Sequence, residues 1–342
     1  MTSIETDETP EDGSASGGRR RSLAWLSTVV GLAVGGLTTF YVVRTLIDEW
    51  PAASAALETA SLSWIAVAAV LALLAMTAMG WGWGFVLRLF GVRVPSARVV
   101  AWYFVGELGK YLPGGVWTVL GRGELARRGG VPRTRAYASV AMSLAMLYLA
   151  AMFVASAFLP FTLSGDGANV WMLFLLALPV GVLALHHAVL ERVLALVVRI
   201  SGRELTLEIP RWRDSLIMVA CYLPAWIFVG GGTWAVARAL DPSASFSRIM
   251  FAALLSWVAG FIAVPVPAGA GVREAVLVAS SGLDPGTAAA TAIVARMLFL
   301  LADLVGAAVG APLAGRKRSG ATVAPITGVS SDAPPEETRP EP

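Results

Sequence analysis

The residues of this chain best able to do chemistry are charged side chains set between long apolar runs. The stretch "GELGKYLPGGVWTVLGRGELARRGGVPR", residues 106–133, places four of them around a Pro-Gly-Gly break: Glu107, Lys110, Arg122 and Glu124. A charge in hydrocarbon costs at least about 2.5–3.5 kcal/mol, so such groups usually face a bundle interior or mark a pathway. The helix N–H groups after a break also favour an anion such as phosphate. We therefore expect part of an anion-binding cavity here.

A second stretch, "VPAGAGVREAVLVASSGLDPGTAAA", repeats the order of these features. Each stretch has a proline followed by glycines, an arginine with a nearby glutamate, a short apolar helix and a glycine before a new apolar run. Broken helices at membrane depth are tolerated only when buried in protein or lining a wet cavity, and paired breaks point to a transporter's substrate site. The expected substrate-binding residues are Glu107, Lys110, Pro113, Gly114, Gly115, Arg122, Glu124, Pro267, Gly269, Gly271, Arg273, Glu274, Arg296 and Asp303.

Plainer interpretations of these residues stay open. Glu107 and Lys110 lie three residues apart on one helix face, so they could simply pair with each other. Pro113-Gly114-Gly115 could be an ordinary turn, and each Arg-Glu pair could be structural. Arg296 and Asp303 lie seven residues apart on one face of the last apolar run, which favours a place inside the bundle.

Composition defines the elements that must position these groups. The chain has 56% hydrophobic and only 14% charged residues, against about 25% charged in soluble domains. This predicts an all-α polytopic membrane protein with about 7–8 transmembrane helices and two Pro/Gly-broken re-entrant segments that form a weak internal repeat. The apolar runs long enough to span a bilayer are 23–47, 62–87, 136–159, 169–187, 214–239, 246–264 and 287–313.

The expected organisation is a disordered acidic tail, residues 1–20, a translocator-like membrane domain, residues 21–314, and a disordered tail, residues 315–342. The repeat-like elements lie near 98–159 and 250–313. Arg-rich connections place the amino terminus in the cytoplasm by the positive-inside rule. Seven crossings would leave "GRKR" at residues 315–318 outside, so the sequence leaves the side of the carboxyl terminus open. The expected location is the plasma membrane.

Several classes of function lack support in the sequence. No basic patch with interleaved aromatics indicates nucleic acid, and no P-loop, metal-ligand helix or nucleophile elbow is present. Cys221 is the lone cysteine, so no disulfide can form within the chain. We therefore expect no catalytic residue, no metal and no cofactor.

The segments "GKYLPGGVWTVLGR" and "VPVPAGAGVREAVLVASSGL" together resemble the transmembrane domain of lysylphosphatidylglycerol synthases, over roughly residues 20–315. The resemblance implies a free-standing lipid translocator without the soluble aminoacyl-transferring domain, and hence no synthesis of aminoacyl lipid. The second motif of that family more often reads Pro-Gly-Gly-Leu-Gly. Here it is Pro267-Ala268-Gly269-Ala270-Gly271, which preserves the backbone break but not every side chain.

The leading hypothesis is a flippase for an anionic or aminoacylated phospholipid or a lipid-linked substrate, with no visible ATPase. Its partners would be that lipid, the membrane and a separate lipid-modifying enzyme. One alternative is an integral-membrane enzyme acting on phospholipid or polyprenyl-linked substrates, with Glu107, Glu124 or Glu274 as acid or base. Another is a scaffold for a separate lipid synthase that transports nothing. Each carboxylate lies near a basic residue, which favours binding over proton transfer.

Overall fold

The computed structural model describes residues 60–112, 116–162, 212–263, 267–315 and 322–323, with scattered positions between 40 and 58. The chain divides into two compact units, 1–49 and 50–342. In the first unit, Arg44 and Asp48 form an exposed ion pair of 3.4 Å one helical turn apart. The second unit contains every element considered below. The expected spans 23–47 and 169–187 lie largely or wholly outside the described residues.

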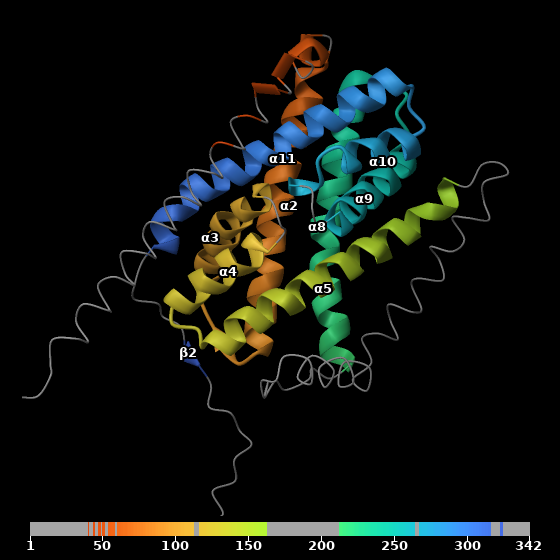
Figure 1. Ribbon diagram of the computed structural model, residues 1–342. Helices are drawn as coiled ribbons and strands as arrows, with labels where there is room; N and C mark the ends of the chain where they lie inside the picture. Colours follow the sequence, from red (N-terminus) through yellow and green to blue (C-terminus); the bar gives the residue numbers. More distant parts are fainter. Residues whose placement is uncertain are drawn as a thin grey trace, which may run out of the picture. The chain divides into compact units, whose positions relative to one another are not determined.

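Four long apolar helices have the length and composition needed to cross a membrane. They are α2 (Leu62–Leu89), α5 (Arg133–Phe158), α8 (Trp212–Leu240) and α11 (Pro285–Ala314) (Figure 1). These helices match four of the expected spans and confirm an all-α membrane protein. The total of seven or eight crossings stays a prediction, because two of the expected runs fall outside the described residues.

Shorter elements lie between the long helices. They are β1 (Val92–Arg93), α3 (Ser96–Glu107), η1 (Leu108–Tyr111), α4 (Trp117–Arg128), η2 (Leu159–Phe161), α9 (Phe246–Ile262), η3 (Pro267–Gly269), α10 (Val272–Ser280) and β2 (Thr322–Val323). The run 246–264, expected to span, forms the 17-residue α9. This helix is shorter than the roughly 20 residues of a simple span, because its hydrogen-bonded backbone ends before the Pro/Gly break.

The same order of elements occurs twice. The first hairpin, α3–η1–α4, is followed by a turn at Gly130 and the long helix α5, and the second hairpin, α9–η3–α10, by a turn at Gly282 and the long helix α11. Both turn glycines have positive φ, 97° and 71°. Within each hairpin the two helices pack together (Figure 1). The two hairpins also meet, because η1 contacts η3.

Each hairpin is closed by a glycine of the entering helix against an arginine of the returning helix. A Cβ on Gly106 would lie 2.9 Å from the backbone nitrogen of Arg122. A Cβ on Gly260 would lie 2.6 Å from Cδ of Arg273. Real Cβ atoms do not approach other atoms this closely, so a Cβ on Gly106 would force the backbone to shift, whereas one on Gly260 would displace the Arg273 side chain. These matching glycine–arginine contacts are a second similarity between the two hairpins, in addition to the order of features in the sequence, and they support an internal repeat.

The core of the second unit lies where α2, α5 and α8 pack together. Two of its buried aromatic side chains place their polar atoms on partners. Trp83 donates from Nε1 to Ser139 Oγ at 3.1 Å, and the Tyr222 and Ser143 hydroxyls lie 2.6 Å apart. Such pairing is needed because an unpaired polar group in an apolar interior is costly. The packed core therefore fixes the positions of the long helices relative to one another, beside the hairpins.

A two-stranded antiparallel pair departs from the expected tail. Val92 and Arg93 pair with Val323 and Thr322, respectively. These two residues of the segment 315–342 therefore have regular structure, although the segment was expected to be disordered. Its lack of an apolar pattern gave no sign of this pairing.

Candidate functional site

A cavity of about 270 Å³ lies between the two hairpins, where η1 and η3 meet. Four of the expected site residues line it: Glu107 and Lys110 from the first hairpin, and Gly269 and Arg273 from the second. The structure thus brings together groups that are more than 150 residues apart in the chain. That both Pro/Gly breaks line this cavity stays a prediction, because residues 113–115 lie outside the described residues.

Lys110 connects the cavity to a buried carboxylate. Its Nζ lies 2.6 Å from Oδ2 of Asp303 on α11 and 3.6 Å from Oε1 of Glu107. The hydroxyl of Tyr111 donates to the same Asp303 oxygen at 2.8 Å. Asp303 is completely buried, whereas Lys110 retains some exposure at the cavity wall. The lysine is therefore the member of this network that a bound molecule can reach.

Arg122 lies behind the cavity wall and does not line the cavity. Its guanidinium is buried, forms an ion pair with Glu107 and lies 4.1 Å from the ring centroid of Tyr103. Two of its nitrogens, Nε and Nη1, have no hydrogen-bond partner among the described residues. Arg122 is thus the counter-ion that keeps Glu107 charged inside the bundle.

The alternative that Arg122 and Glu124 form a structural pair is wrong. Glu124 faces outward, where its carboxylate binds Arg127 at 2.7 Å and Arg128 at 2.8 Å on the next turn of α4. Arg127 and Arg128 are both exposed. Residues two apart on a helix point to nearly opposite sides of it. Arg122 and Glu124 therefore cannot both point at one partner. Glu124 does not line the cavity.

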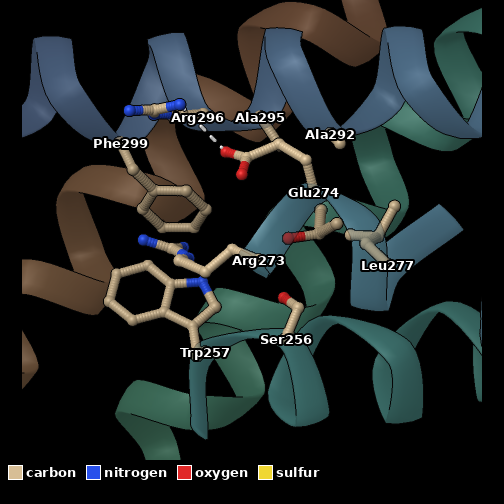
Figure 2. A pocket seen from close by; sticks show the side chains of 10 residues that line it. Ser256, Trp257, Arg273, Glu274, Leu277, Ala292, Ala295, Arg296 and Phe299 are labelled. Carbon is tan, nitrogen blue, oxygen red and sulfur yellow. Dashed lines mark hydrogen bonds and ion pairs between the residues drawn. The ribbon is translucent and has the colours of Figure 1, made fainter. Parts of the chain in front are cut away.

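The second hairpin holds a different arrangement. The Arg273 guanidinium lies over the Trp257 ring (Figure 2), and it is 3.8 Å from the ring centroid. The next residue, Glu274, instead pairs through Oε1 with Arg296 Nη1 at 3.1 Å. Among the described residues Arg273 has no hydrogen bond or ion pair. Stacking on an aromatic face leaves the N–H groups of a guanidinium available to a ligand.

A smaller pocket of about 20 Å³ lies on the other side of Arg273 (Figure 2). Glu274, Arg296 and the hydroxyls of Thr233 and Ser256 help to line it. A space of this size holds one water molecule when several polar groups surround it. It is too small for a lipid headgroup, so the larger cavity is the candidate site.

Among the described residues, the charged groups that line the cavity or the smaller pocket, together with their ion-pair partners, do not cancel. Arg122 pairs with Glu107, Lys110 with Asp303, and Arg296 with Glu274, so one of four cations is left over. That cation is Arg273. The seven groups of this count are Lys110, Arg122, Arg273, Arg296, Glu107, Glu274 and Asp303. The cavity is therefore electrostatically suited to one anionic group.

The remaining expected residues differ in whether they lie at the cavity. Gly271, with φ 79°, precedes α10 and does not line the cavity. Pro267 begins η3, and Ala268 after it lines the cavity with φ 50°. Pro113, Gly114 and Gly115 lie outside the described residues.

Aromatic lining residues were missed from the sequence. Tyr148 and Phe261 stack with ring centroids 3.7 Å apart, and with Trp257 they form much of the cavity wall. In the sequence they sit inside apolar runs, where an aromatic residue is equally consistent with core packing. Only the hairpin geometry places them beside the charges.

The acidic side chains near the cavity have defined partners. In the part of the chain that the structure describes, no three His, Cys, Asp or Glu side chains are grouped to hold a metal ion. The carboxylates near the cavity are each engaged by a basic group. The cavity is lined by the two hairpins and by α5, one of the four membrane-length helices, so the fold and the site define an all-α membrane protein with a charged cavity.

Comparison with known families agrees with this class. The model of the family described as lysylphosphatidylglycerol synthase TM region matches residues 24–310. The chain belongs to this family of multi-pass membrane proteins. A search of curated proteins gives no match to the chain.

Proposed function

We propose that the protein moves an anionic or aminoacylated phospholipid, or a related lipid-linked substrate, between the two leaflets of the membrane. The observation that carries the proposal is Arg273, which lines the cavity and has no carboxylate partner among the described residues. A guanidinium offers a planar fork of N–H donors that matches two phosphate oxygens. The lipid phosphate would supply the anionic partner that Arg273 lacks.

The cavity wall suits a molecule with both polar and apolar parts. Lys110 and Arg273 supply positive charge from opposite hairpins, while Leu144, Tyr148 and Phe261 supply apolar surface. A headgroup would lie between the two hairpins, and the acyl chains would remain in the hydrocarbon. This division explains why charges are placed inside the bundle at a cost that a purely structural helix pair would avoid.

The two hairpins are proposed to be re-entrant. Neither α4, with 12 residues, nor α10, with 9, is long enough to span a bilayer. Broken helices that meet at a wet cavity near the membrane centre are typical of transporters, in which one repeat moves against the other. Because η1 and η3 touch, such movement would open the site to one leaflet at a time.

The two alternative functions find less support. An enzyme would need an acid or base free to exchange a proton with substrate, yet Glu107 and Glu274 are held by Arg122 and Arg296. A scaffold that transports nothing would have no use for an unpaired arginine in a cavity. Binding of a separate lipid-modifying enzyme remains compatible with transport.

The amino terminus is proposed to face the cytoplasm of a plasma membrane. Arg127, Arg128, Arg133 and Arg135 cluster at the connection between α4 and α5, as the positive-inside rule requires for that side. Accessible tags at residue 10 and near Gly129 are expected on the cytoplasmic side, and a tag near Ser164 outside. Residues 10 and 164 on the same side would contradict this orientation.

Reconstitution tests the transport proposal. Purified protein in phosphatidylcholine vesicles with a trace of dye-labelled phosphatidylglycerol would be exposed to dithionite, which bleaches only the outer leaflet. Transport predicts that bleaching reaches the inner pool in vesicles with protein but not in empty vesicles. Dye-labelled phosphatidylcholine, which carries no net charge, should move more slowly. The proposal would be rejected if, for each labelled lipid, vesicles with protein bleached no further than empty vesicles.

A further inference from the structure

We propose that Asp303 takes up a proton when an anionic headgroup draws Lys110 away from it, so that headgroup binding is coupled to proton binding. The inference rests on the proposed function and names its coupling ion. It is carried by the position of Lys110, which is shared between a buried carboxylate and the cavity wall.

The ammonium group of Lys110 can form a close ion pair with only one anion at a time. Its Nζ lies close to Asp303 Oδ2, at 2.6 Å, and further from Glu107 Oε1, at 3.6 Å. A phosphate between Lys110 and Arg273 would compete directly for the ammonium group. Because an ammonium is a compact charge on a flexible stem, it can turn toward the cavity without movement of the backbone.

Asp303 cannot easily remain charged without Lys110. Its side chain is completely buried, and its Oδ1 has no partner among the described residues. After loss of Lys110, the Tyr111 hydroxyl would be the one donor left to the carboxylate among the described residues. A buried carboxylate with so little compensation accepts a proton rather than keep its charge.

The elements packed against α11 offer no replacement cation in the described part of the chain. From α3 and η1, the groups facing Asp303 are Tyr103, Glu107, Lys110 and Tyr111, and α10 carries Arg273 and Glu274. The titratable residues of α2 and α8 are Arg88, Arg213, Asp214, Cys221, Tyr222 and Arg238. The last of these, Arg238, lies by Trp64 and Trp234, and Tyr222 by Ser143. On α11 itself, Arg296 is held by Glu274.

Glu107 does not compete for the proton. It loses a more distant contact when Lys110 turns, and it keeps the buried Arg122 as its partner. The exchange is therefore specific to Asp303. The proton comes from bulk water and forms one O–H bond on the Asp303 carboxyl, so each bound monoanion arrives with one proton and the charge of the site stays constant.

Proton uptake on binding tests this directly. Detergent-purified full-length protein in weakly buffered solution near pH 7 would be mixed with dihexanoyl-phosphatidylglycerol while a pH dye reports protons and calorimetry reports binding. Parallel mixing with glycerophosphoglycerol separates the lipid from its free phosphodiester headgroup. We expect uptake approaching about one proton per bound molecule. Uptake with either probe supports the exchange and identifies which form of the phosphate triggers it.

Two variants sharpen the result. Asp303→Asn should bind the probe with proton uptake abolished, whereas Glu124→Gln, an outward-facing control in the first hairpin, should match the unmodified protein. If Asp303→Asn does not fold, Lys110→Met provides the second test: without the lysine Asp303 is already protonated, so this variant should bind the probe more weakly and take up no proton on binding. Binding by the unmodified protein without proton uptake would overturn the exchange but leave transport standing. Absence of binding with both probes would overturn transport and the exchange together.

Discussion

Arg122 is the buried partner of Glu107, although Glu124 is far closer to it in the sequence. The pair ties α4 to the end of α3 just behind the cavity wall, and the arginine also covers the ring of Tyr103. Removing one partner of a buried ion pair leaves an uncompensated charge, which typically costs about 3–5 kcal/mol. This pair is therefore expected to support folding of the hairpin, whereas Arg273 is expected to bind the ligand.

The first prediction separates these roles by double substitution. Arg122→Gln should sharply lower the yield of monodisperse protein, by an amount corresponding to about 3–5 kcal/mol. The double variant Arg122→Gln/Glu107→Gln should recover much of that yield, because no buried charge remains unpaired. Size-exclusion chromatography of membrane extracts measures both.

Glu124 provides the matched control for this experiment. Arg122→Gln/Glu124→Gln should behave no better than Arg122→Gln, because Glu124 pairs with Arg127 and Arg128 at the surface. Exposed pairs are worth only about 0–1 kcal/mol, so Glu124→Gln alone should be mild. Rescue of Arg122→Gln by the Glu124 substitution would contradict the pairing described here.

The second prediction concerns the backbone of η3. Ala268 has φ 50°, a left-handed conformation that costs a residue with a Cβ about 1–2 kcal/mol. The family resemblance favours glycine at this place. Ala268→Gly should raise the thermal stability of the purified protein by about 0.5–1 kcal/mol, since the strain relieved exceeds the added chain entropy. An unchanged or lower melting temperature would argue against the strained turn.

The third prediction tests whether the cavity holds water. Leu144 lines the cavity, while its neighbour Ser143 is buried against Tyr222 on another face of α5. In a Cys221→Ala background, Leu144→Cys should react with a water-soluble maleimide and Ser143→Cys should not. Mass spectrometry counts the adducts. Equal reactivity at the two positions would mean that the cavity offers no special access to water.

The fourth prediction compares the two closing glycines. A methyl group on Gly106 meets the backbone of Arg122, whereas one on Gly260 meets mainly the Arg273 side chain. Gly106→Ala should therefore reduce folded yield, because backbone cannot move away. Gly260→Ala should fold but transport poorly, because it displaces the guanidinium from Trp257. Wild-type transport by Gly260→Ala, at normal protein level, would count against the assigned position of Arg273.

Much of this arrangement could be predicted from the sequence. Charges and Pro/Gly breaks are costly inside a membrane, so each one that occurs in an apolar chain indicates a structural or functional role. The long spans, the order of the two hairpins and a shared cavity with Lys110 and Arg273 followed from apolar length and Pro/Gly placement. The pairing of Arg122 was not accessible. Proximity in sequence suggested Glu124, but the helix turns Glu124 outward and the hairpin brings Glu107 back.

Aromatic and small residues were the other omission. Trp257 and Tyr148 are ordinary members of apolar runs until the chain reverses and places them beside Arg273 and Glu107. Likewise, a glycine within a helix has many uses, and only the close approach of two helices shows that a Cβ on Gly260 would displace the Arg273 side chain. These properties depend on contacts between hairpins, which local patterns do not encode.

Lipid movement by Arg273 variants in the dithionite vesicle assay tests the central claim most directly. Arg273→Lys keeps the charge without the fork of donors and should transport dye-labelled phosphatidylglycerol slowly, and Arg273→Gln should be slower still, both at normal protein level. Arg127→Gln, at the exposed end of α4, should match the unmodified protein. The expected order of rates is therefore unmodified protein and Arg127→Gln, then Arg273→Lys, then Arg273→Gln. Unchanged transport by folded Arg273→Gln would contradict the proposal that this arginine holds the lipid phosphate.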